Sequence, residues 1–309
     1  MSFSNSYRYA SGSGLPYTPP LDAQNAAAAY SIRKLRTDYT GNCIRISDNP
    51  TFSGSTKDVG FDSNGYLDIS ELYTNSYIRT WYDQSGNGLD FIQNSTNKSP
   101  LISLSGIVEE VNGIAAMYFN GSNHFLQILS STSSFNFFHN GSKSSFYFVG
   151  QVGDTANPSF QSVLLGNSRG SNDVGINFWY SDISGRNDAL IQSGYRGVGG
   201  SNAVSYISPN NTFLPNNQFL SVNELDFSDP TLTDRWMTQF NNDSILKGNT
   251  QNVGFSTSNA DENLTLMAEG SGTNWWTKGF CQELIIYDTD QSANKATLQT
   301  NINDYFSIY

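Results

Sequence analysis

Short hydrophobic runs, and runs in which apolar and polar residues alternate, follow one another along most of the chain. Alternation with a period of two indicates a strand with one buried face, and a short apolar run indicates a fully buried strand. Gly, Asn and Ser residues that favour turns separate the runs. The runs comprise residues 43–46, 58–61, 77–82, 117–119, 146–150, 162–166, 175–180, 219–222, 234–240, 264–267 and 279–287. Because no helical pattern lies between them, the sequence predicts an all-β antiparallel β-sandwich.

Helical periodicity is confined to the two ends of this series. Asp22 is a suitable N-cap for a first helix whose early part is rich in alanine. The spacing i, i+4, i+7 gives that helix a buried face of Ala28, Ile32 and Leu35. A second helix is predicted after Asp290 or Ser292, either of which can cap it. Its buried face consists of Leu298, Ile302 and Phe306.

The first 21 residues are rich in Ser, Tyr, Gly and Pro and carry no hydrophobic pattern. We therefore divide the chain into an extended N-terminal arm, residues 1–21, and one domain, residues 22–309. Two interpretations of the arm are open. It is either a frayed terminus or a tether that docks on a neighbouring subunit.

The charge balance limits the classes of partner. The 309 residues include 16 Lys and Arg against 27 Asp and Glu, a formal net charge of −11. Without a basic surface to neutralise phosphates, nucleic acid and an anionic membrane are not expected as partners. No run of about 18 apolar residues occurs, so no membrane insertion is expected. The first residues lack the apolar segment of a signal peptide, so export by the ordinary route is not expected.

Cysteine and histidine are too few for a metal site or a Ser-His-Asp triad. The chain has two cysteines, Cys43 and Cys281, and two histidines, His124 and His139. Their spacing matches no metal-binding motif, so we predict no metal and no cofactor. Two interpretations of the cysteines stay open: buried free thiols, or a disulfide that joins the start of the domain to its end.

Two stretches of the sequence resemble a known family. Residues 27–36, 39–41 and 58–61 lead to a block of Trp81, Tyr82, Asp83, Gln84, Ser85, Gly86, Asn87 and Gly88. This stretch resembles the N-terminal half of the catalytic domain of the α-L-arabinofuranosidase B family of glycoside hydrolases. It also resembles related domains found in tailed bacteriophages. Residues 279–288 resemble the closing strand of concanavalin-like, laminin-G-type jelly rolls, so the resemblance implies a concanavalin-like jelly roll.

The residues of the block are expected to determine the fold. Asp83 and Gln84 stand at a strand end, where they can hydrogen-bond backbone amides of the following turn. Gly86 and Gly88 permit a positive φ.

The resemblance does not carry over the catalytic pair. In the family, the acid/base Asp lies in a Gly-rich loop before the closing strand. Ser271 falls at that place here, and a serine hydroxyl is not a useful general acid near neutral pH. Glu269 is a substitute if the loop has shifted. The family's nucleophile is a Glu on a central strand, but residues 175–180 hold no acid, and Glu224 is the nearest candidate. We therefore expect no enzymatic activity, with Glu269 and Glu224 as fallback catalytic residues.

Aromatic residues in the same loop suggest carbohydrate binding. Trp275 and Trp276 are adjacent in a Gly/Asn/Thr loop, so at least one of them should be exposed and able to stack on a sugar face. Asn274 can supply hydrogen bonds to hydroxyls. The alternative is that one Trp closes the core and the other packs on a neighbouring subunit.

Together these features predict a bacteriophage virion structural protein with a catalytically inactive, lectin-like domain. It would lie on the particle surface, form a homo-oligomer, contact other virion proteins through the arm and take host glycans as a candidate ligand. The alternative is an active glycoside hydrolase of arabinofuranosidase type. A cell-surface carbohydrate-binding module is a third hypothesis.

Overall fold

The computed structural model describes residue 15 and residues 17–153, 159–170, 173–183, 186–196, 208–212, 214–248 and 256–309, with only the backbone for residues 159–161, 182–183, 186–187 and 190–196. Its first half comprises η1 Pro20–Asp22, β1 Ala28–Ser31, β2 Ile44–Ser47, β3 Thr56–Val59, η2 Ile69–Glu71, β4 Ser76–Trp81, β5 Phe91–Ile92, β6 Leu101–Leu104, β7 Ile107–Val108, β8 Glu110–Val111, β9 Ile114–Ala115, β10 Met117–Asn120, β11 Leu126–Gln127 and η3 Asn136–Phe138. Its second half comprises β12 Ser144–Val152, β13 Ser159–Gly166, β14 Val174–Ile183, β15 Arg186–Arg196, β16 Gln218–Leu225, η4 Leu232–Asp234, β17 Trp236–Phe240, β18 Leu246–Lys247, β19 Thr265–Leu266, β20 Lys278–Tyr287 and α1 Lys295–Phe306.

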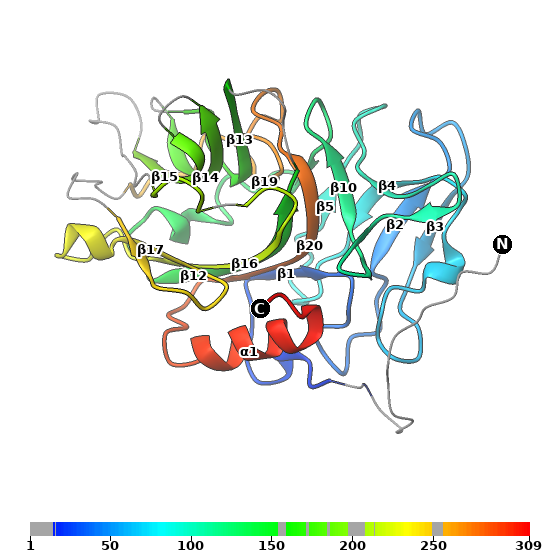
Figure 1. Cartoon of the computed structure of the whole chain (residues 1–309), viewed down its shortest axis with the longest axis horizontal. Helices are drawn as coiled ribbons and strands as arrows, with labels where there is room; N and C mark the ends of the chain where they lie inside the picture. Colours follow the sequence, from blue (N-terminus) through cyan, green and yellow to red (C-terminus); the bar gives the residue numbers. More distant parts are fainter. Residues whose placement is uncertain are drawn as a thin grey trace.

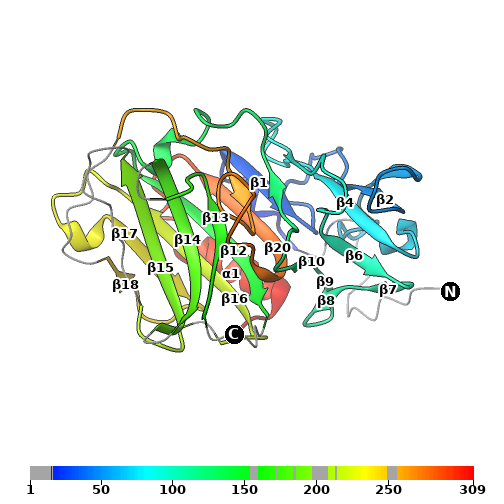
Figure 2. The same cartoon turned by 90° about the horizontal axis from the view of Figure 1, so that it is seen from above.

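The strands form an antiparallel β-sandwich (Figures 1 and 2). One layer runs β17–β16–β12–β20–β1, and the other contains β15–β14–β13–β19–β11. Phe146 of β12 packs between the layers against Phe178 of β14, with ring centroids 5.5 Å apart. Helix α1 lies on the outer face of the first layer (Figure 1). The all-β sandwich predicted from the alternating runs is therefore confirmed.

The C-terminal helix is confirmed, but its predicted cap is wrong. Leu298, Ile302 and Phe306 are buried, as the i, i+4, i+8 spacing predicts. The residue that precedes the first turn is Asn294, and no side chain caps it. Asp290 instead accepts a hydrogen bond from the backbone N–H of Ser292, in the turn before the helix. No helix among the described residues is long and apolar enough to cross a membrane.

The N-terminal helix predicted after Asp22 is wrong. The region contains only the short 3-10 turn η1, and its alanine-rich part is strand β1. Ala28 and Ala29 are fully buried and pair with Ile286 and Ile285 of β20. Helix propensity is a weak preference, and burial between neighbouring strands overrides it here. The carboxylate of Asp22 accepts hydrogen bonds from Thr37 and caps no helix.

A fully buried ion pair joins the segment after β1 to the last strand, β20. Arg33 Nε lies 2.8 Å from Glu283 Oε2 and Arg33 Nη2 lies 3.0 Å from Glu283 Oε1, and both side chains are 0% exposed. Ser31 Oγ donates a further hydrogen bond to the same carboxylate. The guanidinium also lies 4.6 Å from the ring centroid of Tyr305 in α1 and 5.3 Å from that of Tyr17. The pair therefore links β20, the segment after β1, the helix and the arm.

The described part of the arm packs on its own domain. Tyr17 donates to the carbonyl oxygens of Lys34 and Gly65, and its ring stacks on Tyr66. Asn301 of α1 donates to the carbonyl of Thr18. Residues 1–14 and 16 lie outside the described residues, so docking of the arm on another subunit stays a prediction.

Arg33→Met is expected to lower the free energy of unfolding by about 3–5 kcal/mol, because Glu283 would remain buried without its partner. Arg45→Met is the matched control. Arg45 forms the same 2.8 Å contact with Asp58, but the two side chains are 48% and 31% exposed, so we expect a loss of about 1 kcal/mol or less. Urea unfolding of both variants measures the difference. Equal losses would show that burial of the first pair is energetically unimportant.

Candidate functional site

The loop between β19 and β20 is built around the carboxylate of Glu269, which is 1% exposed. It accepts hydrogen bonds from the backbone N–H groups of Ser271, Thr273 and Asn274 and from the hydroxyls of Ser271 and Thr273. Gly272 allows the loop to turn with φ +67. Because a buried carboxylate needs such partners, Glu269 fixes the shape of the loop and is closed off from solvent.

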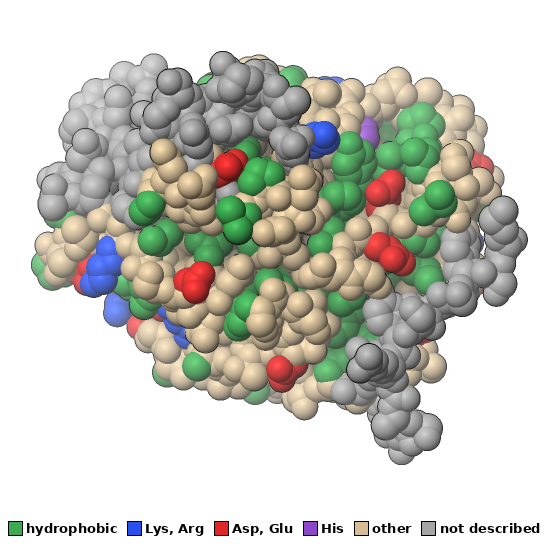
Figure 3. Space-filling model, in the orientation of Figure 1, with side chains coloured by type: hydrophobic (Ala, Val, Ile, Leu, Met, Phe, Trp, Pro, Cys, Tyr) green, Lys and Arg blue, Asp and Glu red, His purple; other side chains and the backbone are tan. Residues whose placement is uncertain are grey.

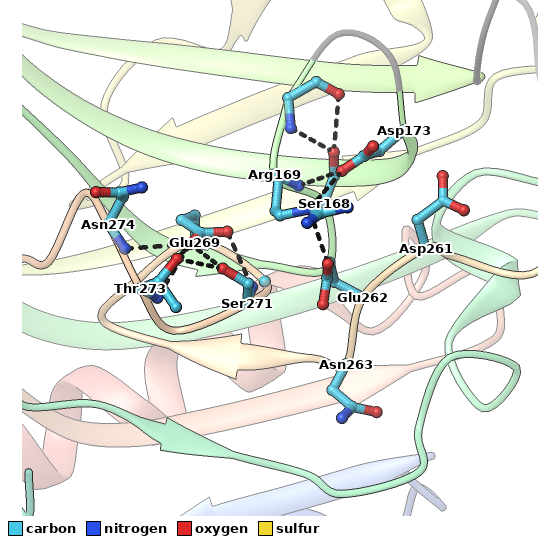
Figure 4. A network of polar contacts seen from close by, with 12 residues as sticks. Ser168, Arg169, Asp173, Asp261, Glu262, Asn263, Glu269, Ser271, Thr273 and Asn274 are labelled. Atoms are coloured by element: carbon cyan, nitrogen blue, oxygen red, sulfur yellow. Dashed lines mark hydrogen bonds and ion pairs between the residues drawn. The ribbon is translucent and has the colours of Figure 1, made fainter.

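Two more accessible carboxylates meet at an arginine beside this loop (Figure 4). Arg169 Nε lies 2.8 Å from Glu262 Oε1 and 3.5 Å from Asp173 Oδ2. The two carboxylate oxygens are therefore no farther apart than the sum of these distances, about 6 Å. The side chains of Asp173 and Glu262 are 16% and 20% exposed. Gly270 N–H donates to the carbonyl of Ser168, which ties the Glu269 loop to this cluster.

The environment of the cluster raises the pKa of Glu262. Burial raises the pKa of Glu262, and the negative charges of Glu269, Asp173 and Asp261 act in the same direction. The guanidinium of Arg169 opposes them. A carboxyl group that keeps its proton to higher pH is suited to donate it to a leaving group.

An aromatic surface lies beside the loop. Trp275 is 39% exposed, and its ring centroid lies 4.7 Å from that of Trp179 on β14. Val163 of β13 donates its N–H to the carbonyl of Trp275, which holds the loop against the sheet. Trp276 is half-buried and donates from Nε1 to the carbonyl of Gly272. Trp275 is thus the ring of the pair that is available for stacking.

Buried polar groups without a partner lie on the same face of β14. Residues two apart on a strand share a face, so Asn177 lies beside Trp179. Within the described residues, three of these atoms have no hydrogen-bond partner: Oδ1 and Nδ2 of Asn177, and Nε1 of Trp179. A Cβ at Gly166 would lie 1.9 Å from Oδ1 of Asn177, so only glycine leaves room for that amide. Buried polar groups of this kind are commonly satisfied by bound water.

Glu224 lies on a different face of the molecule from the Glu269 loop. Its carboxylate is 2.6 Å from Nζ of Lys295 in α1, on the outer side of β16. The preceding residue, Asn223, points to the opposite side, where it accepts a hydrogen bond from Trp236 Nε1. The structure therefore does not bring the two fallback carboxylates Glu269 and Glu224 together.

The block from Trp81 to Gly88 holds the first strand in place. Asp83 accepts hydrogen bonds from the N–H groups of Ala29, Ser85 and Leu89. Gln84 accepts from the N–H of Leu35 and donates to the carbonyls of Ser31 and Arg33. Trp81 is fully buried, and Tyr82 donates a hydrogen bond to Asp58. Asn87 donates to the carbonyls of Ala26 and Ala27. Gly86 and Gly88 have φ +93 and +73.

The sulfur and imidazole groups form no reactive centre. Cys43 and Cys281 are buried free thiols, and burial raises the pKa of each. Burial lowers the pKa of His124 to about 4 and lowers that of His139. Among the described residues, no group of three or more His, Cys, Asp or Glu side chains is arranged to hold a metal ion.

Arg169, Asp173, Asp261 and Glu262 were not predicted as site residues. The sequence offers one signal for two of them, the adjacent acids Asp261 and Glu262 just before the apolar run 264–267 in a chain with only 14% charged residues. Their meeting with Arg169 and Asp173 depends on the pairing of β13 with β19.

Comparison with solved structures identifies the fold. An arabinofuranosidase complexed with arabinofuranosyl-α-1,2-xylobiose is 15% identical, with a TM-score of 0.58. A GH54 α-L-arabinofuranosidase mutant soaked with 4-nitrophenyl α-L-arabinofuranoside is 13% identical, with a TM-score of 0.62. Each comparison covers 90% of this chain and 62% of the other, so this chain spans less than two thirds of their length. No protein-family model and no curated protein matches the sequence.

These comparisons correct one expectation. The prediction that the chain is not an enzyme is contradicted, because the proteins that it resembles in structure are glycoside hydrolases. The arabinofuranosidase structures do not test a virion role, so that part of the hypothesis stays a prediction. The chain has the glycoside-hydrolase-like β-sandwich fold of the GH54 α-L-arabinofuranosidases.

Glu262 is expected to titrate above the usual glutamate pKa of about 4.3. Arg169→Gln should raise its pKa further, because the guanidinium favours the ionised form. Glu269→Gln should lower it, because a nearby negative charge is removed while a hydrogen-bond acceptor remains. Carbon-detected NMR titration of the glutamate carboxyls measures both shifts. A Glu262 that titrates at the same pH in all three proteins would contradict this coupling.

Proposed function

We propose that the protein is a glycoside hydrolase that cleaves arabinofuranosyl or related glycosidic bonds at the cluster of Arg169, Asp173 and Glu262. The observation that carries the proposal is the pair of partly exposed carboxylates, no more than about 6 Å apart, beside an exposed tryptophan. Glycoside hydrolases use two such carboxyl groups, about 5–5.5 Å apart in retaining enzymes and about 6.5–9.5 Å apart in inverting ones. The proposal takes the retaining mechanism, in which one of the two carboxylates is the nucleophile. The preference for arabinofuranosides rests on the structural neighbours and is part of the proposal.

The two carboxylates have different roles in this proposal. Glu262, whose pKa is raised by burial, protonates the leaving oxygen and later deprotonates a water molecule. Asp173 attacks the anomeric carbon and forms the glycosyl-enzyme intermediate. Arg169 holds both carboxylates in the free protein. Its side chain is 61% exposed, so an arriving sugar can displace it from Glu262, which then takes up a proton.

The neighbouring loop positions the sugar. Trp275 stacks on the sugar ring, and the exposed Asn274 hydrogen-bonds its hydroxyls. Trp276 supports the loop through its bond to Gly272. Glu269 acts as a positioning residue, because five of its hydrogen bonds hold the loop and its side chain is closed to solvent.

The protein's location is a separate proposal, that the domain is displayed on a tailed-phage particle. Its support is the sequence resemblance to phage domains and a polar surface with few charges on the face drawn in Figure 3. Homo-oligomerisation and contacts with other virion proteins through residues 1–21 belong to the same proposal. Immunogold labelling of purified particles checks it. Label at fixed positions is expected, and unlabelled particles beside free protein in the lysate would refute it.

Hydrolysis of 4-nitrophenyl α-L-arabinofuranoside is the test of the enzymatic proposal. Glu262→Gln and Asp173→Asn are each expected to lower kcat/KM by about 100-fold or more, because each removes one of the two reacting carboxyl groups. Glu71→Gln changes an exposed carboxylate paired with Lys57 and should leave the rate unchanged.

Glu224→Gln distinguishes hydrolysis at the Arg169 cluster from hydrolysis at a site that contains Glu224. A large loss of activity in Glu224→Gln, with Glu262→Gln active, would move the site to the outer face of β16. Absence of turnover by the unaltered protein at high concentration would refute arabinofuranoside hydrolysis.

A further inference from the structure

A hollow lies where three turns meet, at the start of β16. It encloses about 380 Å³, which is within the usual range of ligand pockets, about 300–1,000 Å³. Its walls come from the turn between β8 and β9, from residues 211–212, 214 and 216–219, from the turn between β17 and β18, and from Ile308 after α1. None of these segments contributes to the Arg169 cluster or the Trp275 loop. We refer to this hollow as the amide groove.

Carboxamide side chains dominate the lining of the amide groove. They are Asn112, Asn211, Asn216, Asn217, Gln218 and Asn241. Each carboxamide offers both donors and an acceptor, which matches the hydroxyl groups of a sugar. The lining includes one carboxylate, Asp243, and no Lys, Arg or His. The rings of Phe219 and Phe240, with centroids 5.8 Å apart, add an apolar base. This chemistry fits a neutral ligand rich in hydroxyls.

Four of the lining amides belong to residues in tight turns. Asn112, Asn211, Asn216 and Asn241 all have a left-handed backbone, with φ between 46 and 63. Glycine meets that requirement as well as asparagine does, and without a side chain. The turns therefore account for the backbone conformation, while the use of asparagine at all four positions places four amides around one hollow.

A chain of hydrogen bonds to a buried residue of β20 holds part of the lining in place. Asn112 Nδ2 donates to Gln218 Oε1 at 2.6 Å, and Gln218 donates to Gln282 of β20. Gln282 is fully buried and donates to the carbonyls of Ile114 and Ala115. This relay fixes the orientation of the amides before a ligand arrives, which lowers the entropy cost of binding.

Other amides of the groove remain available. The side chains of Asn211 and Asn217 are exposed and make no hydrogen bond within the part of the chain that the structure describes. We infer that the amide groove is a second carbohydrate-binding site, which holds a neutral polysaccharide away from the site of hydrolysis. This inference goes beyond the proposed function, because binding here needs neither Glu262 nor Trp275.

The test is affinity electrophoresis of the whole chain in native gels that contain arabinoxylan, arabinan or glucomannan, with polygalacturonate as the anionic comparison. At least one neutral polysaccharide should retard the protein. Asn112→Gly combined with Asn211→Gly should raise the apparent Kd about tenfold, because two amides are lost while the left-handed backbone is retained. Asn242→Gly is the matched control. It lies next to Asn241 with φ 61 but does not line the groove, and it should leave the Kd unchanged.

Thermal unfolding of each variant checks that it is folded. Should the double variant melt early, Asn217→Ala carries the same test, because Asn217 is exposed and has no positive φ. The inference is overturned if no neutral polysaccharide retards the protein, if polygalacturonate retards it more strongly, or if the groove variants bind normally. It is also overturned if Trp275→Ala alone abolishes retardation. Arabinofuranoside hydrolysis, measured on the same variants, should be unchanged by the groove substitutions, so failure of the hydrolase proposal is seen separately.

Discussion

The buried ion pair of Arg33 and Glu283 is the contact on which most of this structure depends. An isolated charge inside a protein is very costly, so each of these side chains requires the other in its observed place. The pair fixes the segment after β1 against β20, and the aromatic rings around the guanidinium fix helix α1 and the arm to the same point. Asp83 and Gln84 complete this arrangement by binding the backbone of residues 29–35.

The groups proposed to react or to bind a sugar lie outside this buried arrangement, in loops at the edges of the sandwich. In a chain with few charges, three acids and one arginine still gather beside the loop that carries a fourth acid, Glu269 (Figure 4). Partial burial raises the pKa of Glu262, and this concentration of like charge acts in the same direction. The amide groove differs in kind, because carboxamides dominate its lining and two of them, Asn112 and Gln218, are fixed by a hydrogen bond to each other. Reaction and binding would then use separate parts of one sandwich.

Much of the fold could be predicted from the sequence, because alternation and turn residues are local signals. The helix stripe of Leu298, Ile302 and Phe306 was equally local and is confirmed. The alanine-rich segment at Ala28 misled the prediction, since its strand conformation depends on β20, some 250 residues away. The sequence did not predict the carboxylate cluster, because this cluster also depends on contacts between distant parts of the chain. Asp173 and Glu262 are distant in sequence and meet only through strand pairing.

The proposal that Asp173 is the nucleophile of a retaining glycosidase is tested most directly by peptide mass spectrometry. The protein is first incubated with an arabinofuranose-configured cyclic sulfate. Such an electrophile is expected to react with the nucleophile of a retaining glycosidase and to leave a covalent sugar on it. The account predicts a single adduct on Asp173, which is absent from Asp173→Asn. An adduct on Glu224, or no adduct under conditions that label a known arabinofuranosidase, would contradict it.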